Sequence, residues 1–145
     1  MIENEVQLSD PRVQALWFDR VRKAHLTETV EDYVELIADL ISTYREARVT
    51  DLAKRFGVSQ ATVSKVISRL RTLGYIENRP HRSLFLTPKG ETLAQKCKHR
   101  HQIILDFLTS LGISQATAEF DSEGLEHHVS DETLRAFQRY IKKNA

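Results

Sequence analysis

The feature that most constrains the fold is a punctuated run of residues from 50 to 88, in which short apolar-patterned segments alternate with glycines and capping residues. Thr50 is a suitable N-cap for a short helix, and Gly57 follows that helix where a left-handed C-cap favours glycine. Ser59 is a suitable cap for a second helix, which Gly74 ends. This order predicts two short helices joined by a tight turn.

A β-hairpin is predicted after the second helix. Its strands are Tyr75–Glu77 and Ser83–Thr87, around the turn Asn78-Arg79-Pro80-His81-Arg82. Thr87-Pro88 then opens a long helix to about Ser110, because proline is favoured at the first helical position. Two helices, a glycine turn and a hairpin predict a winged helix-turn-helix, in which the hairpin is the wing.

The side chains of the second helix favour nucleic-acid binding. Its apolar stripe is Val63, Val66, Ile67, Leu70 and Leu73, and polar or basic residues occupy its other faces. Glutamine, serine and threonine can read base edges, whereas lysine and arginine neutralise phosphates. The predicted DNA-binding residues are Ser59, Gln60, Thr62, Ser64, Lys65, Arg69, Arg79 and Arg82.

The charge distribution along the chain supports this interpretation. The formal net charge is only +1, but residues 52–90 carry eight Lys or Arg and one acid, Glu77. Residues 101–134 carry seven acids and no Lys or Arg. The basic segment suits a polyanion and the acidic segment suits a cation.

The remaining elements are predicted to be helical. A polar tail (residues 1–10) precedes a helix from Pro11 to about His25, and a second helix runs from about Thr29 to Ala47. Gly112 ends the long helix, and short helices follow near 114–120, 122–129 and 131–142. We therefore expect a mainly α fold, with an N-terminal extension (1–27), a winged helix domain (28–90) and a helical metal-binding and dimerisation domain (91–145).

The acidic segment contains a candidate metal motif. Glu123, Glu126 and His127 stand at i, i+3 and i+4, which places them on one face of a helix. Carboxylates with one or two imidazoles suit harder divalent ions such as Mn(II). By spacing alone Asp32 and Glu35 are explained by a solvated polar face, and Cys97 by a buried structural thiol.

From Asp32 to His128 the chain resembles the diphtheria toxin repressor family, and within it the manganese transport regulators. The resemblance covers roughly residues 28–140. It rests on Glu31-Asp32-Tyr33-Val34-Glu35, on the winged helix, on His99-Arg100-His101-Gln102, and on Glu123-Gly124-Leu125-Glu126-His127-His128-Val129-Ser130. The resemblance implies metal ligands at Asp32, Glu35, His101, Glu123, Glu126 and His127. Iron-responsive relatives carry methionine and cysteine at the positions of Asp32 and Glu123, so oxygen donors there imply manganese.

The resemblance implies a Mn(II)-responsive transcriptional regulator, a repressor that controls manganese homeostasis genes. We expect two Mn(II) ions per subunit, a homodimer on double-stranded operator DNA, and no membrane association. Without an apolar leader, the expected location is the cytoplasm. Two alternatives stay open: a winged-helix regulator that ignores metals, which a chelator would not affect, and a dinuclear-metal hydrolase or oxidase. We expect no enzyme, because no separate nucleophile pattern appears and the basic segment would be unexplained.

Overall fold

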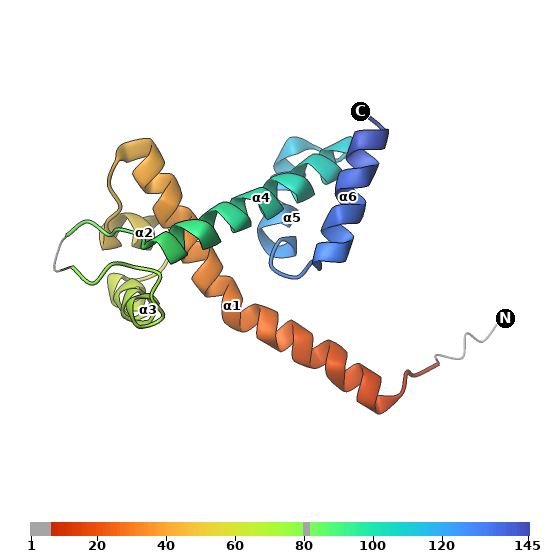
Figure 1. Cartoon of the computed structure of the whole chain (residues 1–145), viewed down its shortest axis with the longest axis horizontal. Helices are drawn as coiled ribbons and strands as arrows, with labels where there is room; N and C mark the ends of the chain where they lie inside the picture. Colours follow the sequence, from red (N-terminus) through yellow and green to blue (C-terminus); the bar gives the residue numbers. More distant parts are fainter. Residues whose placement is uncertain (1–6, 80–81) are drawn as a thin grey trace.

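The computed structural model describes residues 7–79 and 82–145, and within them the chain is mainly helical (Figure 1). The helices are α1 (Pro11–Tyr44), α2 (Val49–Phe56), α3 (Gln60–Thr72), α4 (Pro88–Ser110), α5 (Gln115–Leu125) and α6 (Asp131–Lys143).

Helix α1 is one continuous helix of 34 residues, so the predicted division between His25 and Thr29 is wrong. The Asp10 carboxylate caps its start by accepting from the Arg12 N–H at 2.8 Å. No glycine or proline interrupts it, and the Thr27 hydroxyl donates to the Ala24 carbonyl at 3.1 Å instead of breaking the turn. The helix ends where Arg45 turns left-handed at φ 62°.

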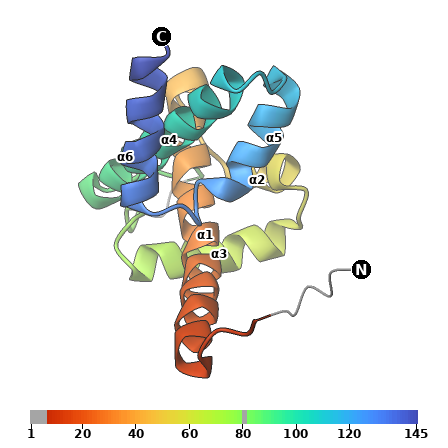
Figure 2. The same ribbon diagram turned by 90° about the vertical axis from the view of Figure 1, so that its right-hand side faces the viewer.

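The two halves of α1 lie in different surroundings. Its second half is buried through Val30, Tyr33, Val34, Ile37 and Leu40. Its first half extends away from the other helices, as Figures 1 and 2 show from two directions. One helix therefore carries both a core element and a projecting arm.

The helix-turn-helix is present at the predicted place. Gly57 adopts φ 68° between α2 and α3, a left-handed conformation that favours glycine. The Ser59 hydroxyl caps α3 by accepting from the Thr62 N–H at 3.1 Å. Thr50 does not cap α2; the helix begins at Val49, and the Asp51 carboxylate accepts from the Arg48 N–H at 3.2 Å.

The segment between α3 and α4 does not form the two predicted strands over its described residues. It shows only isolated bridges, Ile76 with Leu86 and Arg48 with Ser83. The second arm pairs on two sides: the Glu77 N–H donates to the Phe85 carbonyl at 2.8 Å and the Thr87 N–H to the Tyr75 carbonyl at 3.0 Å, while the Leu84 N–H donates to the Ala47 carbonyl at 2.7 Å. Each pairing is limited to a single bridge among the described residues. Residues 80 and 81, which include the predicted tip residue His81, lie outside the described residues.

Helix α4 joins two hydrophobic cores. Thr87 caps it and Pro88 opens it, as predicted. Gly90 lets it pass close to the preceding segment, because a Cβ there would lie 2.2 Å from the Tyr75 carbonyl oxygen. Its first half, with Ala94, belongs to the core of α1, α2 and α3. Its second half forms a smaller core with α6 through Ile103, Ile104 and Leu134.

Helix α5 is a single helix, so the two short helices predicted at 114–120 and 122–129 are wrong. No breaker separates them, since Gly124 is helical and the buried Ser122 hydroxyl donates to the Ala118 carbonyl at 2.5 Å. The helix ends at Leu125, and residues 126–128 form a turn before α6. None of the described helices is both long and apolar enough to span a membrane.

Candidate metal centre and nucleic-acid surface

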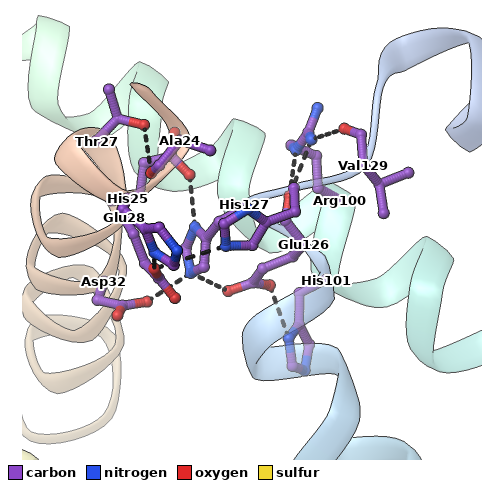
Figure 3. A network of polar contacts seen from close by, with 12 residues as sticks. Ala24, His25, Thr27, Glu28, Asp32, Arg100, His101, Glu126, His127 and Val129 are labelled. Carbon is purple, nitrogen blue, oxygen red and sulfur yellow. Dashed lines mark hydrogen bonds and ion pairs between the residues drawn. The ribbon is translucent and has the colours of Figure 1, made fainter. Parts of the chain in front are cut away.

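Three elements bring polar side chains to one place beneath the turn after α5 (Figure 3). Helix α1 supplies Asp32 and Glu35, and α4 supplies His101. Glu123 comes from α5, while Glu126 and His127 lie just beyond its end. All six residues that the family resemblance implied as ligands are thus assembled from segments far apart in the sequence.

Glu126 occupies the centre of this cluster and is 1% exposed. Its Oε2 lies 2.8 Å from His101 Nδ1. Its Oε1 lies 3.3 Å from His127 Nε2 but is buried without a hydrogen-bond partner among the described residues. Arg100 supports the backbone here by donating to the Glu126 carbonyl at 2.9 Å and 3.0 Å. A buried carboxylate oxygen without a donor is poorly satisfied by the protein alone.

His127 links the turn to α1. Its Nδ1 lies 2.7 Å from Glu31 Oε2, and its Nε2 lies 2.8 Å from Asp32 Oδ1. Burial of the ring lowers its pKa, but the hydrogen bonds to Asp32 and Glu31 outweigh this and raise the pKa of His127 to about 10. Two carboxylates therefore hold positive charge at this ring.

The carboxylates crowd one another. Burial, with the charge of Glu126, raises the pKa of Glu35 to about 7. Burial and the same neighbour raise the pKa of Glu123, whose side chain is 70% exposed in the structure. The hydrogen bond of the His101 ring to the Glu126 carboxylate raises the pKa of His101, because the carboxylate stabilises the charged ring. Burial is the larger cause of the raised pKa of Glu35 and Glu123, and the charge of Glu126 adds to it, a charge that a cation would neutralise.

Two overlapping groups of donor atoms can be drawn through Glu126. One is Glu35, His101 and Glu126, and the other is Asp32, Glu123 and Glu126; in each, the donor atoms lie within 4.8 Å of one another. Carboxylates with imidazoles are the donors that Mn(II) accepts, and the orphaned Glu126 oxygen fits a cation ligand. Cys97 offers no competing thiolate, since it is buried and burial raises its pKa to about 12.

The cluster is open to solvent on the side of the helix-turn-helix. A hollow of about 350 Å³ is lined by Asp32, Glu35 and Glu123, and by Arg55 and Phe56 at the end of α2. The candidate cation ligands therefore lie next to the end of α2. The interpretation of Asp32 and Glu35 as a solvated polar face is wrong, because both are half-buried against the α5 turn.

Sequence reasoning missed Glu31 and Arg100, which hold His127 and the Glu126 carbonyl. The spacing of Glu28, Glu31, Asp32 and Glu35 was the available signal, since these acids form one helical stripe without intervening cations. His99 is exposed and outside the described donor groups.

The predicted DNA-binding residues are all exposed. Six of them lie on or next to α3, and Arg79 and Arg82 flank the undescribed residues 80 and 81. Arg82 and Ser64 line a hollow of about 470 Å³ between α3 and the segment before α4. Arg79 is less free, because its Nε lies 2.7 Å from Glu77 Oε2.

Comparison with known families covers nearly all of this architecture. Residues 25–84 match the N-terminal DNA-binding domain of iron-dependent repressors. Residues 87–145 match the metal-binding and dimerisation domain of the same proteins. The boundary between the two matches falls at the start of α4, the helix shared by both cores.

Individual relatives agree. The transcriptional regulator MntR of Escherichia coli O157:H7 is 54% identical over 127 residues, which is 88% of this chain and 82% of the relative. The regulator MntR of Geobacillus kaustophilus is 38% identical over 72% of this chain and 74% of its own. A solved manganese-dependent transcriptional repressor in complex with manganese superposes with TM-score 0.71 at 28% identity, over 77% of this chain. This chain spans only about half of that structure's chain, 52%.

Proposed function

The chain belongs to the iron-dependent repressor family, also called the diphtheria toxin repressor family, and from that membership we propose a Mn(II)-responsive transcriptional regulator that represses manganese homeostasis genes. The observation that carries the choice of metal is the all-oxygen-and-nitrogen donor set around the buried, hydrogen-bond-deficient Glu126. The MntR name of the relatives supports the same choice.

Residues 28–90 are the DNA-binding domain in this proposal, and residues 91–145 the metal-binding and dimerisation domain. Helix α3 is the recognition helix: Ser59, Gln60, Thr62 and Ser64 face base edges near its start, while Lys65 and Arg69 contact phosphates. The segment between α3 and α4 acts as the wing, with Arg79 and Arg82 on the DNA backbone. The exposure of all eight side chains supports this assignment.

Two Mn(II) ions bind per subunit, held by Asp32, Glu35, His101, Glu123, Glu126 and His127. The two donor groups that share Glu126 support a site whose residues would hold two ions. Bound Mn(II) would supply positive charge to the carboxylates that His101 and His127 contact in this structure. In this structure Glu31 and Asp32 contact the His127 ring. Arg100 donates to the Glu126 carbonyl in the same turn.

The site can bias DNA binding because its ligands come from both units of the molecule. Asp32 and Glu35 belong to α1, whose second half packs in the same core as α2 and α3. His101 and Glu126 belong to the other unit. Ligands from both units restrict their relative motion, and a metal that prefers one arrangement shifts the population towards it.

A homodimer places two recognition helices on two half-sites of double-stranded operator DNA. The second unit supports a dimer, because Leu111, Phe120, Leu125 and Tyr140 expose apolar surface, Phe120 at 83%. Large exposed apolar side chains mark an association surface where they gather in one patch. The proposed location is the cytoplasm.

The test selects DNA from a random-sequence pool with the full-length protein and Mn(II), then measures binding of the selected duplex by fluorescence anisotropy at buffered free metal. We expect tight binding with Mn(II), and loss of binding on chelation. Binding that a chelator leaves unchanged would show a regulator that ignores metals.

A further inference from the structure

A second group of metal-ligand side chains lies beside the proposed manganese centre, and none of its residues is among the six proposed manganese ligands, although Glu28 also forms a donor group with Asp32 and His127. It consists of His25 and Glu28 on α1 and His128 in the turn after α5. Their donor atoms lie within 4.8 Å of one another. His25 comes from the projecting half of α1, outside the helix segment that enters the core.

The distances suit a small cation held by three ligands. His25 Nδ1 lies 3.1 Å from Glu28 Oε2, and His128 Nε2 lies 3.7 Å from the same oxygen. Two ligands of a tetrahedral zinc ion with bonds of about 2.0–2.1 Å stand about 3.3–3.4 Å apart. The two observed separations bracket that value, so small rotations of the side chains complete the arrangement.

The surroundings also favour an ion over a simple contact between side chains. Two imidazole nitrogens from separate elements converge on one carboxylate oxygen of Glu28, and the His25 and His128 rings meet edge to face with centroids 4.9 Å apart. The His25 side chain is 62% exposed, which leaves room for water at a remaining coordination position. In Figure 3, His25 and Glu28 lie side by side on the helix that faces His127.

We propose that His25, Glu28 and His128 form a separate Zn(II) site, which fastens the projecting half of α1 to the turn that carries His127. Two imidazoles and one carboxylate are a softer donor set than that of the carboxylate-rich centre beside it, and they are a known zinc combination. The site therefore takes a borderline cation, while Mn(II) is better served by the neighbouring carboxylates.

The site has a mechanical consequence for the molecule. A hollow of about 280 Å³ separates the projecting half of α1 from the turn, and Trp17, Val21 and His128 line it. An ion that joins His25 to His128 holds the two sides of this hollow together. Since His128 follows His127 directly, the same ion restrains the backbone of the turn.

The test measures bound zinc by equilibrium dialysis and elemental analysis of the tag-free full-length protein. His25→Ala and His128→Gln should each bind one zinc ion per chain fewer than the wild type. His99→Ala is the matched control, because His99 is an exposed histidine outside the described donor groups, and it should bind as the wild type does. Wild-type zinc content in either His25→Ala or His128→Gln overturns the proposal.

Fluorescence gives an independent readout, because Trp17 is the chain's one tryptophan and lines the hollow beside His128. Co(II), a paramagnetic substitute for zinc, should quench Trp17 more strongly in the wild type than in His25→Ala. Equal quenching in the two proteins would count against the site. Neither measurement involves DNA or Mn(II), so its failure is distinct from a failure of the proposed regulatory function.

Discussion

The two units that meet along α4 differ in how they are held together. The first unit has a continuous core of fifteen buried residues from α1, α2, α3, the segment before α4 and α4 itself. The buried cluster of the second unit comprises Ile103, Ile104 and Leu134, and three partly buried residues pack against it. Apolar burial stabilises the first unit directly, at about 25 cal/mol per Å².

The second unit is instead organised around polar groups and exposed apolar surface. Its most buried side chains include Glu126 and Ser122, and Phe120 remains 83% exposed. In the proposed function such a unit would gain rigidity from what it binds, because a cation would neutralise the carboxylates and a partner would cover the apolar surface. The difference teaches that the first unit is held by its own core, whereas the second has little apolar burial of its own.

The largest expected effect tests the two cores directly. Leu70→Ala, at a fully buried position in the first core, should destabilise the metal-free protein by about 2–5 kcal/mol. Leu134→Ala in the second cluster should cost less, because fewer neighbours enclose the cavity. Urea unfolding with a chelator present measures both. Equal losses would mean that the second cluster is as well packed as the first.

The next effect concerns the ion. Glu126→Gln keeps the size of the buried side chain but removes its charge, so Mn(II) should lose its enhancement of DNA binding, an effect of about 5–150-fold. Anisotropy at buffered Mn(II) measures this, and circular dichroism checks the fold. Glu132→Gln, an exposed acid on α6, is the matched control and should respond as the wild type does. A full Mn(II) response in Glu126→Gln would remove this residue from the site.

A smaller effect separates the basic surfaces of the two units. Arg82→Ala should reduce the slope of log affinity against log salt by about one unit, if this side chain contacts one phosphate. Arg135→Ala, an exposed arginine on α6, should leave the slope unchanged. Arg79→Ala should have the weaker effect of the two wing substitutions, because Arg79 already pairs with Glu77. An unchanged slope in Arg82→Ala would contradict the wing assignment.

The smallest effect is on metal ranking. Asp32→Met replaces an oxygen donor with a thioether, so Fe(II) or Co(II) should support DNA binding nearly as well as Mn(II) does. The wild type should respond best to Mn(II) even where Zn(II) binds more tightly. Operator binding at buffered free metal, without oxygen for Fe(II), gives the ranking. If the ranking is the same in both proteins, Asp32 does not determine selectivity.

The sequence by itself determined the elements whose cause is local. Gly57 at φ 68°, the Ser59 cap on α3 and the Thr87-Pro88 start of α4 were all predicted. A cap or a left-handed turn depends mainly on atoms within about four residues, so the sequence contains most of what decides it. The predicted Thr50 cap failed because α2 begins earlier, at Val49. The apolar periodicity predicted the helices but misplaced some of their ends. Each of α1 and α5 is one continuous helix where two were predicted, because no helix-breaking residue separates the two parts.

The tertiary structure alone decided which polar groups meet. His127 contacts Glu31 and Asp32 from 96 and 95 residues away, and Glu126 contacts His101 from 25. The same holds for Leu84, whose N–H donates to the Ala47 carbonyl, a pairing with the segment before α2 that the sequence did not predict. Spacing along one helix shows which side chains share a face, but not what packs against that face. That depends on how α1, α4 and α5 fit together, because burial of their apolar sides sets the distances between their polar ones.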